Sequence, residues 1–152
     1  MKKRIALVAH DNMKKDLADW VAKNHNVLGQ HNLVCTGTTG RVVSQVLAER
    51  GLSEELQNIT FLKSGPLGGD QQIGSRIAEG KIDIIVFLCD PMMAQPHDVD
   101  VKALMRIASV YNVPLALNIA TADFIITSPH FEDDYKSEVK DYSAYIERIA
   151  KK

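Results

Sequence analysis

The stretch Ile5-Ala6-Leu7-Val8-Ala9 decides the fold of this chain, and the polar pair His10-Asp11 follows it at once. An unbroken apolar run of this kind is typical of a strand in a parallel sheet that helices cover on both faces. The next segment, residues 13–21, places its apolar side chains at helical spacing, with lysines and aspartates between them. This pattern predicts a surface helix. A buried strand followed by an amphipathic helix is the repeating unit of an α/β fold.

The same alternation continues along the rest of the chain. Short apolar runs predict further strands at 33–35, 60–62, 82–88 and 113–117. Amphipathic segments predict further helices at 42–49, 72–79, 101–111, 121–126 and 142–150. Parallel strands joined by right-handed crossover helices form a doubly wound sheet. We therefore predict a single-domain, Rossmann-like α/β fold over residues 1–152, with a five-stranded parallel sheet and helices on both faces.

The composition excludes several classes of protein. The 18 Lys and Arg residues nearly balance the 19 Asp and Glu residues, so there is no broad positive field to attract nucleic acid or an anionic membrane. No apolar stretch is long enough to span a bilayer. Cys35 and Cys89 are far apart, each within an apolar run, as is typical of reduced thiols in the cytosol. We expect a cytoplasmic protein with neither nucleic acid nor a membrane as its partner.

Polar and titratable residues gather where the predicted strands end. They lie at 10–11, 36–40, 64–70 and 90–100, whereas the strand starts carry few reactive groups. Ligands of doubly wound sheets bind at the carboxyl ends of the strands. The distribution therefore predicts a ligand site on this edge of the sheet.

Two of these segments have the composition of anion-binding loops. Thr36-Gly37-Thr38-Thr39-Gly40 offers hydroxyl donors and small residues before a helix N-terminus, although Thr and Gly also form ordinary turns and helix caps. It has neither the P-loop spacing nor the dinucleotide fingerprint. In Ser64-Gly65-Pro66-Leu67-Gly68-Gly69-Asp70, the carboxylate is either a base beside a bound anion or the N-cap of a helix that begins near Gln71. Lys14 could add a positive charge or be a solvated surface lysine.

Two histidines, His10 and His97, follow strands on the same edge, with several aspartates near them. Such groups can transfer protons at neutral pH. Metal binding is the rival interpretation, but the sequence has no His-x-x-x-His, Glu-x-x-His or Cys/His cluster to support it. The nucleophile elbow Gly-x-Ser-x-Gly of serine hydrolases is also missing.

Five motifs taken together resemble the bacterial methylglyoxal synthase family. They are 6–11 (ALVAHD), 36–40 (TGTTG), 64–72 (SGPLGGDQQ), 90–91 with 96–98 (DP and PHD), and 118–123 (NIATAD). The resemblance implies a cytosolic, homohexameric lyase without a cofactor or metal. It implies conversion of dihydroxyacetone phosphate (glycerone phosphate) to methylglyoxal and inorganic phosphate through an enediolate. Inorganic phosphate would be the product and a candidate inhibitor.

The resemblance also implies roles for individual residues. Asp70 would be the catalytic base, His97 would serve the carbonyl oxygen, and His10 and Asp100 would support the intermediate. The residues expected to bind the phosphate are Lys14, Thr36, Gly37, Thr38, Thr39, Ser64 and Gly65. The family can also place a C-terminal arginine in a neighbouring subunit's site. The aligned residue here is Ile149, and Arg148 and Lys151 are candidate substitutes.

Two other functions are also compatible with these residues. A regulatory module of this fold would bind a small phosphorylated or acidic effector without catalysis, but it would not require Asp70, His97 and Asp100 together. Another triose-phosphate enzyme, an isomerase or a phosphatase, would use similar residues, because an isomerase also needs a base and an electrophile.

Overall fold

The computed structural model describes residues 1–150 and contains one five-stranded parallel sheet in the order β3-β2-β1-β4-β5. The strands are β1 (Arg4–Ala9), β2 (Asn32–Cys35), β3 (Ile59–Phe61), β4 (Ile84–Leu88) and β5 (Leu115–Ala116). Strand β1 lies at the centre, where Leu7 pairs with Cys35 of β2 on one side and with Val86 of β4 on the other. The predicted five-stranded α/β fold is confirmed.

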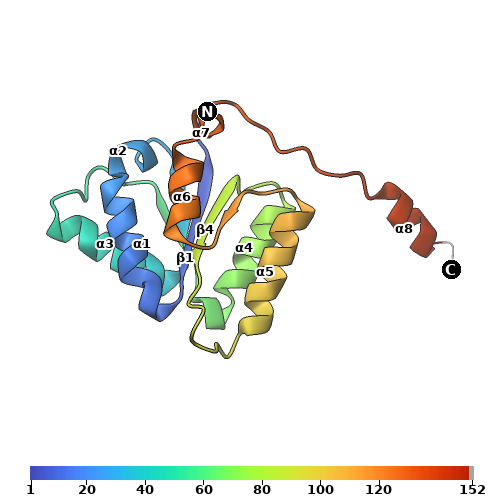
Figure 1. Cartoon of the computed structure of the whole chain (residues 1–152), viewed down its shortest axis with the longest axis horizontal. Helices are drawn as coiled ribbons and strands as arrows, with labels where there is room; N and C mark the ends of the chain where they lie inside the picture. The colour runs from blue at the N-terminus through green and yellow to red at the C-terminus, as the bar shows by residue number, and fades with distance from the viewer. Residues whose placement is uncertain (151–152) are drawn as a thin grey trace.

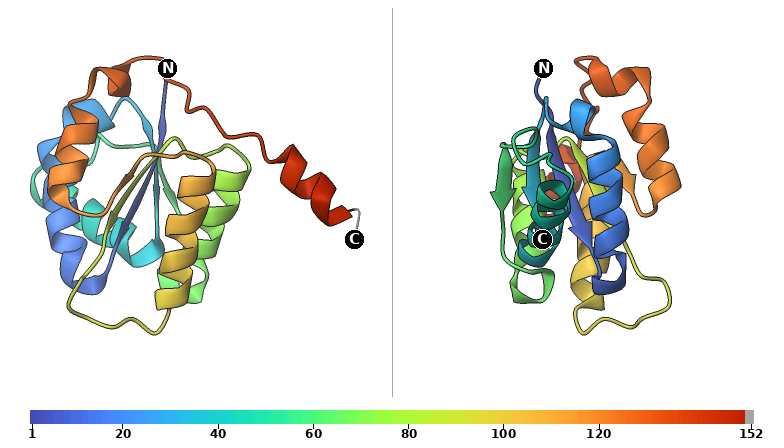
Figure 2. Two further views of the ribbon diagram at one scale, coloured as in Figure 1. Left: turned by 45° about the vertical axis from the view of Figure 1, so that its right-hand side comes forward. Right: turned by 90° about the vertical axis from the view of Figure 1, so that its left-hand side faces the viewer.

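Helices cover both faces of this sheet (Figures 1 and 2). They are α1 (Lys14–Lys23), α2 (His25–Leu28), α3 (Gly37–Glu49), α4 (Gly69–Ala78), α5 (Asp98–Val110), α6 (Ile119–Ile126), α7 (Pro129–Glu132) and α8 (Ser143–Ala150), with short 3-10 turns η1 (Asp11–Met13) and η2 (Gly65–Leu67). Helices α1, α3 and α6 contribute to one apolar cluster, and α4 and α5 contribute to the other.

Strand β1 divides its side chains between these two clusters. Ile5 and Leu7 belong to the cluster with α1 and α3, whereas Ala6 and Val8 belong to the cluster with α4 and α5. Successive side chains of a strand point to opposite faces of the sheet. Both faces of β1 are therefore buried, which explains why its sequence is a continuous apolar run.

The structure corrects the predicted start of α3. The helix begins at Gly37, so Thr38 and Thr39 lie in its first turn and not in a preceding loop. A Cβ on Gly37 would lie 2.9 Å from the Leu62 carbonyl oxygen, because α3 starts very close to the chain that leaves β3. Only a glycine fits that approach without displacing the backbone.

Other element boundaries also differ from the predictions. Strand β4 begins at Ile84, two residues later than expected. The backbone N–H of Arg4 in β1 donates to the side-chain carboxylate of Asp83 at 2.7 Å and not to a backbone carbonyl, so regular strand pairing starts only after Asp83. The prediction omitted the four-residue helices α2 and α7, which are too short for a periodic apolar pattern.

The C-terminal segment leaves the body of the sheet, and α8 lies apart from the other helices (Figure 1). None of the residues of α8 is buried, and Tyr145, Ile146 and Ile149 are each more than half exposed. Within residues 1–150, no helix combines the length and the apolar character needed to cross a membrane.

Candidate active site

A cavity of about 300 Å³ lies at the carboxyl ends of the strands, where the polar segments were predicted to meet. It is lined by Val8, Ala9, His10, Asp11, Lys14, Thr36, Thr38, Ser64, Gly65, Pro66, Leu67, Asp70, Phe87, Gln95 and His97. A larger hollow of about 530 Å³ is found at the other end of the sheet, among apolar side chains such as Ile82 and Val113. Arg4 and Asp83 line that hollow but pair with each other. The smaller cavity is the one that brings His10, Asp70 and His97 together.

Asp70 lies in the first turn of α4 and is buried, with its side chain 1% exposed. Neither carboxylate oxygen has a hydrogen-bond partner within residues 1–150. The alternative that Asp70 merely caps the helix is therefore wrong: the cap residue is Gly68, in the left-handed region at φ 105°. Burial raises the pKa of Asp70, and nearby Asp100 raises it further, against the opposing effect of His97.

His97 precedes α5 at its N-cap position, and its Nε2 lies 3.7 Å from Oδ2 of Asp70. Its other ring nitrogen, Nδ1, is buried without a partner in the described part of the chain. A Cβ on Gly65 would lie 3.2 Å from Oδ2 of Asp70 and 3.2 Å from Nε2 of His97. The missing side chain of Gly65 therefore leaves open the space beside both groups.

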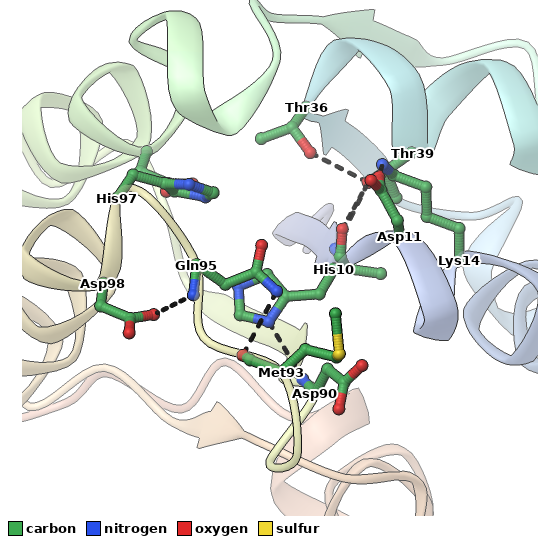
Figure 3. Close-up of polar contacts among 12 residues, drawn as sticks. His10, Asp11, Lys14, Thr36, Thr39, Asp90, Met93, Gln95, His97 and Asp98 are labelled. Atoms are coloured by element: carbon green, nitrogen blue, oxygen red, sulfur yellow. Dashed lines mark hydrogen bonds and ion pairs between the residues drawn. The ribbon is translucent and has the colours of Figure 1, made fainter.

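His10 follows β1 and has a defined tautomer. Its Nδ1 accepts the backbone N–H of Asp90 at 3.0 Å, so the proton of the neutral ring is on Nε2. That Nε2 is buried and has no partner among residues 1–150. Burial lowers the pKa of His10, and the neighbouring His97 lowers it further, which keeps the ring neutral. Figure 3 shows the two histidines facing the same space. His10 therefore presents an uncharged N–H donor.

The opposite wall of the cavity carries hydroxyl groups and one lysine. Thr36, Thr38 and Ser64 line this wall beside the N-terminus of α3. Backbone N–H groups in the first turn of a helix, together with the helix dipole, favour an anion. Lys14 forms an ion pair with Asp11 at the edge of the cavity (Figure 3).

Three of the predicted site residues do not line this cavity: Gly37, Thr39 and Asp100. The backbone N–H of Gly37 donates to the Lys63 carbonyl oxygen, and the buried Thr39 hydroxyl contacts both the N–H and the carbonyl of Ala9 in β1. Both residues position α3 against the sheet. Asp100 lines a separate hollow between α4 and α5, which Asp70 also lines, and acts on Asp70 through its charge.

The cavity also contains residues that the sequence analysis did not select, chiefly Gln95 and Phe87. A single glutamine in a loop has no diagnostic spacing, and Phe87 reads as an ordinary strand residue. A pattern search could have found Gln95 only by its place two residues before His97. Within residues 1–150, no group of three or more His, Cys, Asp or Glu side chains could hold a metal ion.

The chain matches the sequence model of the MGS-like domain over residues 16–117, and it belongs to that family. Its particular relatives are methylglyoxal synthases. The enzyme of Maridesulfovibrio salexigens is 53% identical over 96% of both chains, and that of Coxiella burnetii RSA 493 is 50% identical over 97% of both. The crystal structure of methylglyoxal synthase from Elizabethkingia anophelis NUHP1 superposes with a TM-score of 0.87 at 50% identity, covering 97% of this chain and 91% of that one. The resemblance drawn from the five motifs is confirmed.

Proposed function

We propose that this protein is a methylglyoxal synthase, an enzyme that converts dihydroxyacetone phosphate to methylglyoxal and inorganic phosphate without a cofactor. The observation that carries the proposal is the buried Asp70 carboxylate, which has no hydrogen-bond partner among residues 1–150 and faces a cavity bordered by two histidines. Burying a polar group without a partner is costly, so a substrate that completes the site explains its presence. The named relatives, about half identical over nearly the whole chain, supply the reaction.

Asp70 removes a proton from the hydroxymethyl carbon of the substrate. A C–H next to a ketone is a weak acid, so the base must be strong for a carboxylate. Burial of Asp70 and the charge of Asp100 both raise the pKa of Asp70, which increases its affinity for that proton once it is ionised. Asp100 is thus assigned an electrostatic role, without contact with the substrate.

His10 and His97 stabilise the negative charge that then develops on the substrate's carbonyl oxygen. The Nε2–H of His10 is already oriented, because the backbone of Asp90 holds Nδ1. A preorganised N–H donor in a buried site stabilises an oxyanion strongly, even though the donor itself carries no net charge. His97, next to Asp70, serves the same oxygen from the α5 side.

The phosphate binds between the N-terminus of α3 and the turn η2. Thr36, Thr38, Ser64 and the backbone at Gly65 surround it, and Lys14 supplies a positive charge. Elimination requires the bridging C–O bond to stand out of the plane of the enediolate, where it overlaps the π system. The donors of this site hold the phosphate in that position and stabilise it as it departs. They therefore lower the barrier to elimination relative to that of reprotonation.

The test is to incubate the purified protein with dihydroxyacetone phosphate and to measure methylglyoxal and free phosphate in parallel. Equal release of both products supports the lyase. Formation of glyceraldehyde 3-phosphate would instead establish an isomerase, and phosphate release without methylglyoxal a phosphatase. If the substrate binds but no product forms, the protein is a sensor module.

We further propose that the chain acts in the cytoplasm as a homohexamer, with inorganic phosphate as an inhibitor that competes for the α3 site. The exposed apolar side chains of α8 support assembly, because α8 buries no residue within its own chain. Arg148 lies on this helix, with its guanidinium carbon 5.6 Å from the centre of the Tyr145 ring. Lys151, the other candidate for the family's C-terminal arginine, lies outside the described residues.

Light scattering of the full chain, and of a chain that ends at residue 140, tests the assembly. The full chain should have six times the mass of one copy. The shortened chain should form a smaller species whose circular dichroism spectrum loses only the small helical contribution of α8 (Ser143–Ala150). A monomeric full chain would refute the hexamer.

A further inference from the structure

The loop between β4 and α5 brings a glutamine, Gln95, to the cavity wall beside the two histidines. In Figure 3 its side chain lies near His10 and His97, and its end points into the space that they border. Its backbone N–H donates to the Asp98 carboxylate at 3.2 Å, which ties the residue to the first turn of α5. The position of Gln95 is therefore coupled to that of His97, two residues further along the chain.

The side-chain amide of Gln95 is only weakly engaged within the protein. Its Nε2 has a single contact, to the Met93 carbonyl oxygen at the long distance of 3.5 Å. The hydrogen bonds that Gln95 makes within residues 1–150 use its backbone N–H and its Nε2, and none of them uses Oε1. One amide group thus offers the cavity both a donor and an acceptor.

A donor and an acceptor in one amide suit one group of the substrate better than the others. A phosphate only accepts hydrogen bonds from the protein, and a ketone oxygen also only accepts. A hydroxyl both donates and accepts. The hydroxyl of the hydroxymethyl carbon is therefore the complementary partner of an amide. The threonines suit the phosphate, and the histidines suit the ketone oxygen.

We propose that Gln95 is a specificity-determining residue that recognises the free hydroxyl of the triose phosphate. It holds the hydroxymethyl carbon against Asp70 and discriminates against phosphorylated ketones that lack this hydroxyl. The inference rests on the proposed function for the identity of the substrate.

A binding experiment that does not depend on turnover tests this role. The Asp70→Asn background removes the base, so both ligands remain intact during a titration. Dihydroxyacetone phosphate is compared with hydroxyacetone phosphate, which lacks only the hydroxyl, by calorimetry with and without the added change Gln95→Met. Met matches Gln in length but offers no hydrogen-bonding amide. Loss of one neutral hydrogen bond should weaken the binding of dihydroxyacetone phosphate by about tenfold. The affinity for hydroxyacetone phosphate should change by less than about twofold.

Gln30→Met is the matched control. Gln30 is exposed and also makes one long contact to a backbone carbonyl, that of Asn26 at 3.3 Å, but it lies outside the cavity. This change should affect neither ligand. Equal weakening of both ligands by Gln95→Met would overturn the proposal, because a general disturbance of the loop does not distinguish the hydroxyl. An unchanged affinity for both would overturn it as well.

The result for Gln95 can be separated from the result for the proposed function. If the unmodified protein releases no methylglyoxal but Gln95→Met still weakens only the hydroxyl-bearing ligand, the synthase assignment fails and the recognition role stands. If methylglyoxal forms but the two ligands respond alike, the synthase stands and the role of Gln95 fails.

Discussion

At the scale of single residues, the site depends on groups that the folded chain leaves without partners. Asp70 and His10 are both more than nine-tenths buried, yet the Asp70 carboxylate and Nε2 of His10 have no hydrogen bond within residues 1–150. Natural proteins rarely tolerate such groups without a purpose. Each therefore carries a cost in stability that a bound substrate offsets.

Replacing the base should separate activity from binding. Asp70→Asn should lower kcat by about 10²–10⁴-fold, the usual contribution of a general base. The affinity for inorganic phosphate should stay nearly constant, because the threonines and Lys14 remain in place. Kinetics and calorimetric titration with phosphate measure the two quantities. Near-normal turnover would refute the assignment of Asp70 as the base.

The same variant should be more stable than the natural chain at neutral pH. The pKa of Asp70 is raised in the folded state, so between its ordinary value and the folded one the native protein binds more protons than the unfolded chain. Stability therefore falls as the pH rises through this window, and the loss is complete above it. Asp70→Asn should raise Tm by a few degrees, since about 1 kcal/mol shifts Tm by about 2–4 °C in a chain of this size. Asp134→Asn, an exposed counterpart, should leave Tm unchanged.

Filling the space left by Gly65 should impair catalysis and spare the fold. The backbone of Gly65 is not in the left-handed region, so alanine can adopt it without strain. The added methyl would press on Asp70 and His97, and we expect kcat to fall by about 10²-fold, as small displacements of catalytic groups do. Gly74→Ala in α4 is the control, because its Cβ would meet only Ile107, at 3.8 Å. If both variants lose activity equally, Gly65 has no special place in the site.

At the scale of elements, the N-terminus of α3 combines two tasks in adjacent residues. Thr38 is exposed and lines the cavity, whereas Thr39 is fully buried and contacts the backbone of β1. A helix turns by about 100° per residue, so neighbours point in different directions. The sequence motif alone does not show which of the two threonines faces the cavity, whereas the geometry of the helix does.

These two threonines should respond differently to substitution. Thr38→Ala should weaken phosphate binding by about 10–100-fold, the range for a hydrogen bond to a charged group, with Tm unchanged. Thr39→Val should lower the free energy of unfolding by about 1–3 kcal/mol, because the polar backbone groups of Ala9 lose a buried partner. Calorimetry with phosphate and urea unfolding measure the two effects. Weaker phosphate binding in both variants, with no loss of stability in Thr39→Val, would contradict this division.

At the scale of the whole molecule, a buried histidine links the start of the sheet to the C-terminal segment. His31 accepts the backbone N–H of Lys3 at 3.2 Å and packs edge-on against Phe131 of α7. The ammonium group of Lys3 donates to the carbonyl oxygen of Asp133 at 2.8 Å. The end distant from the active site is thus closed by groups far apart in the sequence.

This cluster should make the protein sensitive to acid. Burial lowers the pKa of His31, and the positive charges of Lys3, the N-terminus and Lys2 lower it further. As the pH falls below about 6.5, the unfolded chain takes up the proton first, so stability declines until the folded pKa is passed. His31→Leu should reduce the difference in urea midpoint between about pH 7.5 and about pH 5.5. The part of this difference that is due to His10, whose pKa is also lowered, should remain. An unchanged difference would exclude His31 as a source.

The sequence by itself determined the α/β fold, the buried central strand and the edge of the sheet that carries the site. Those features follow from local periodicity and from the rule that parallel strands end together. Only the tertiary structure showed that Asp70 does not cap its helix, that Thr39 and Asp100 lie outside the cavity, and that Gln95 lies within it. The physical reason is that burial, side-chain direction and the presence or absence of a partner depend on residues distant in the chain. The pKa of Asp70 is one such property, since it is set by burial and by the charges of His97, Asp100 and His10.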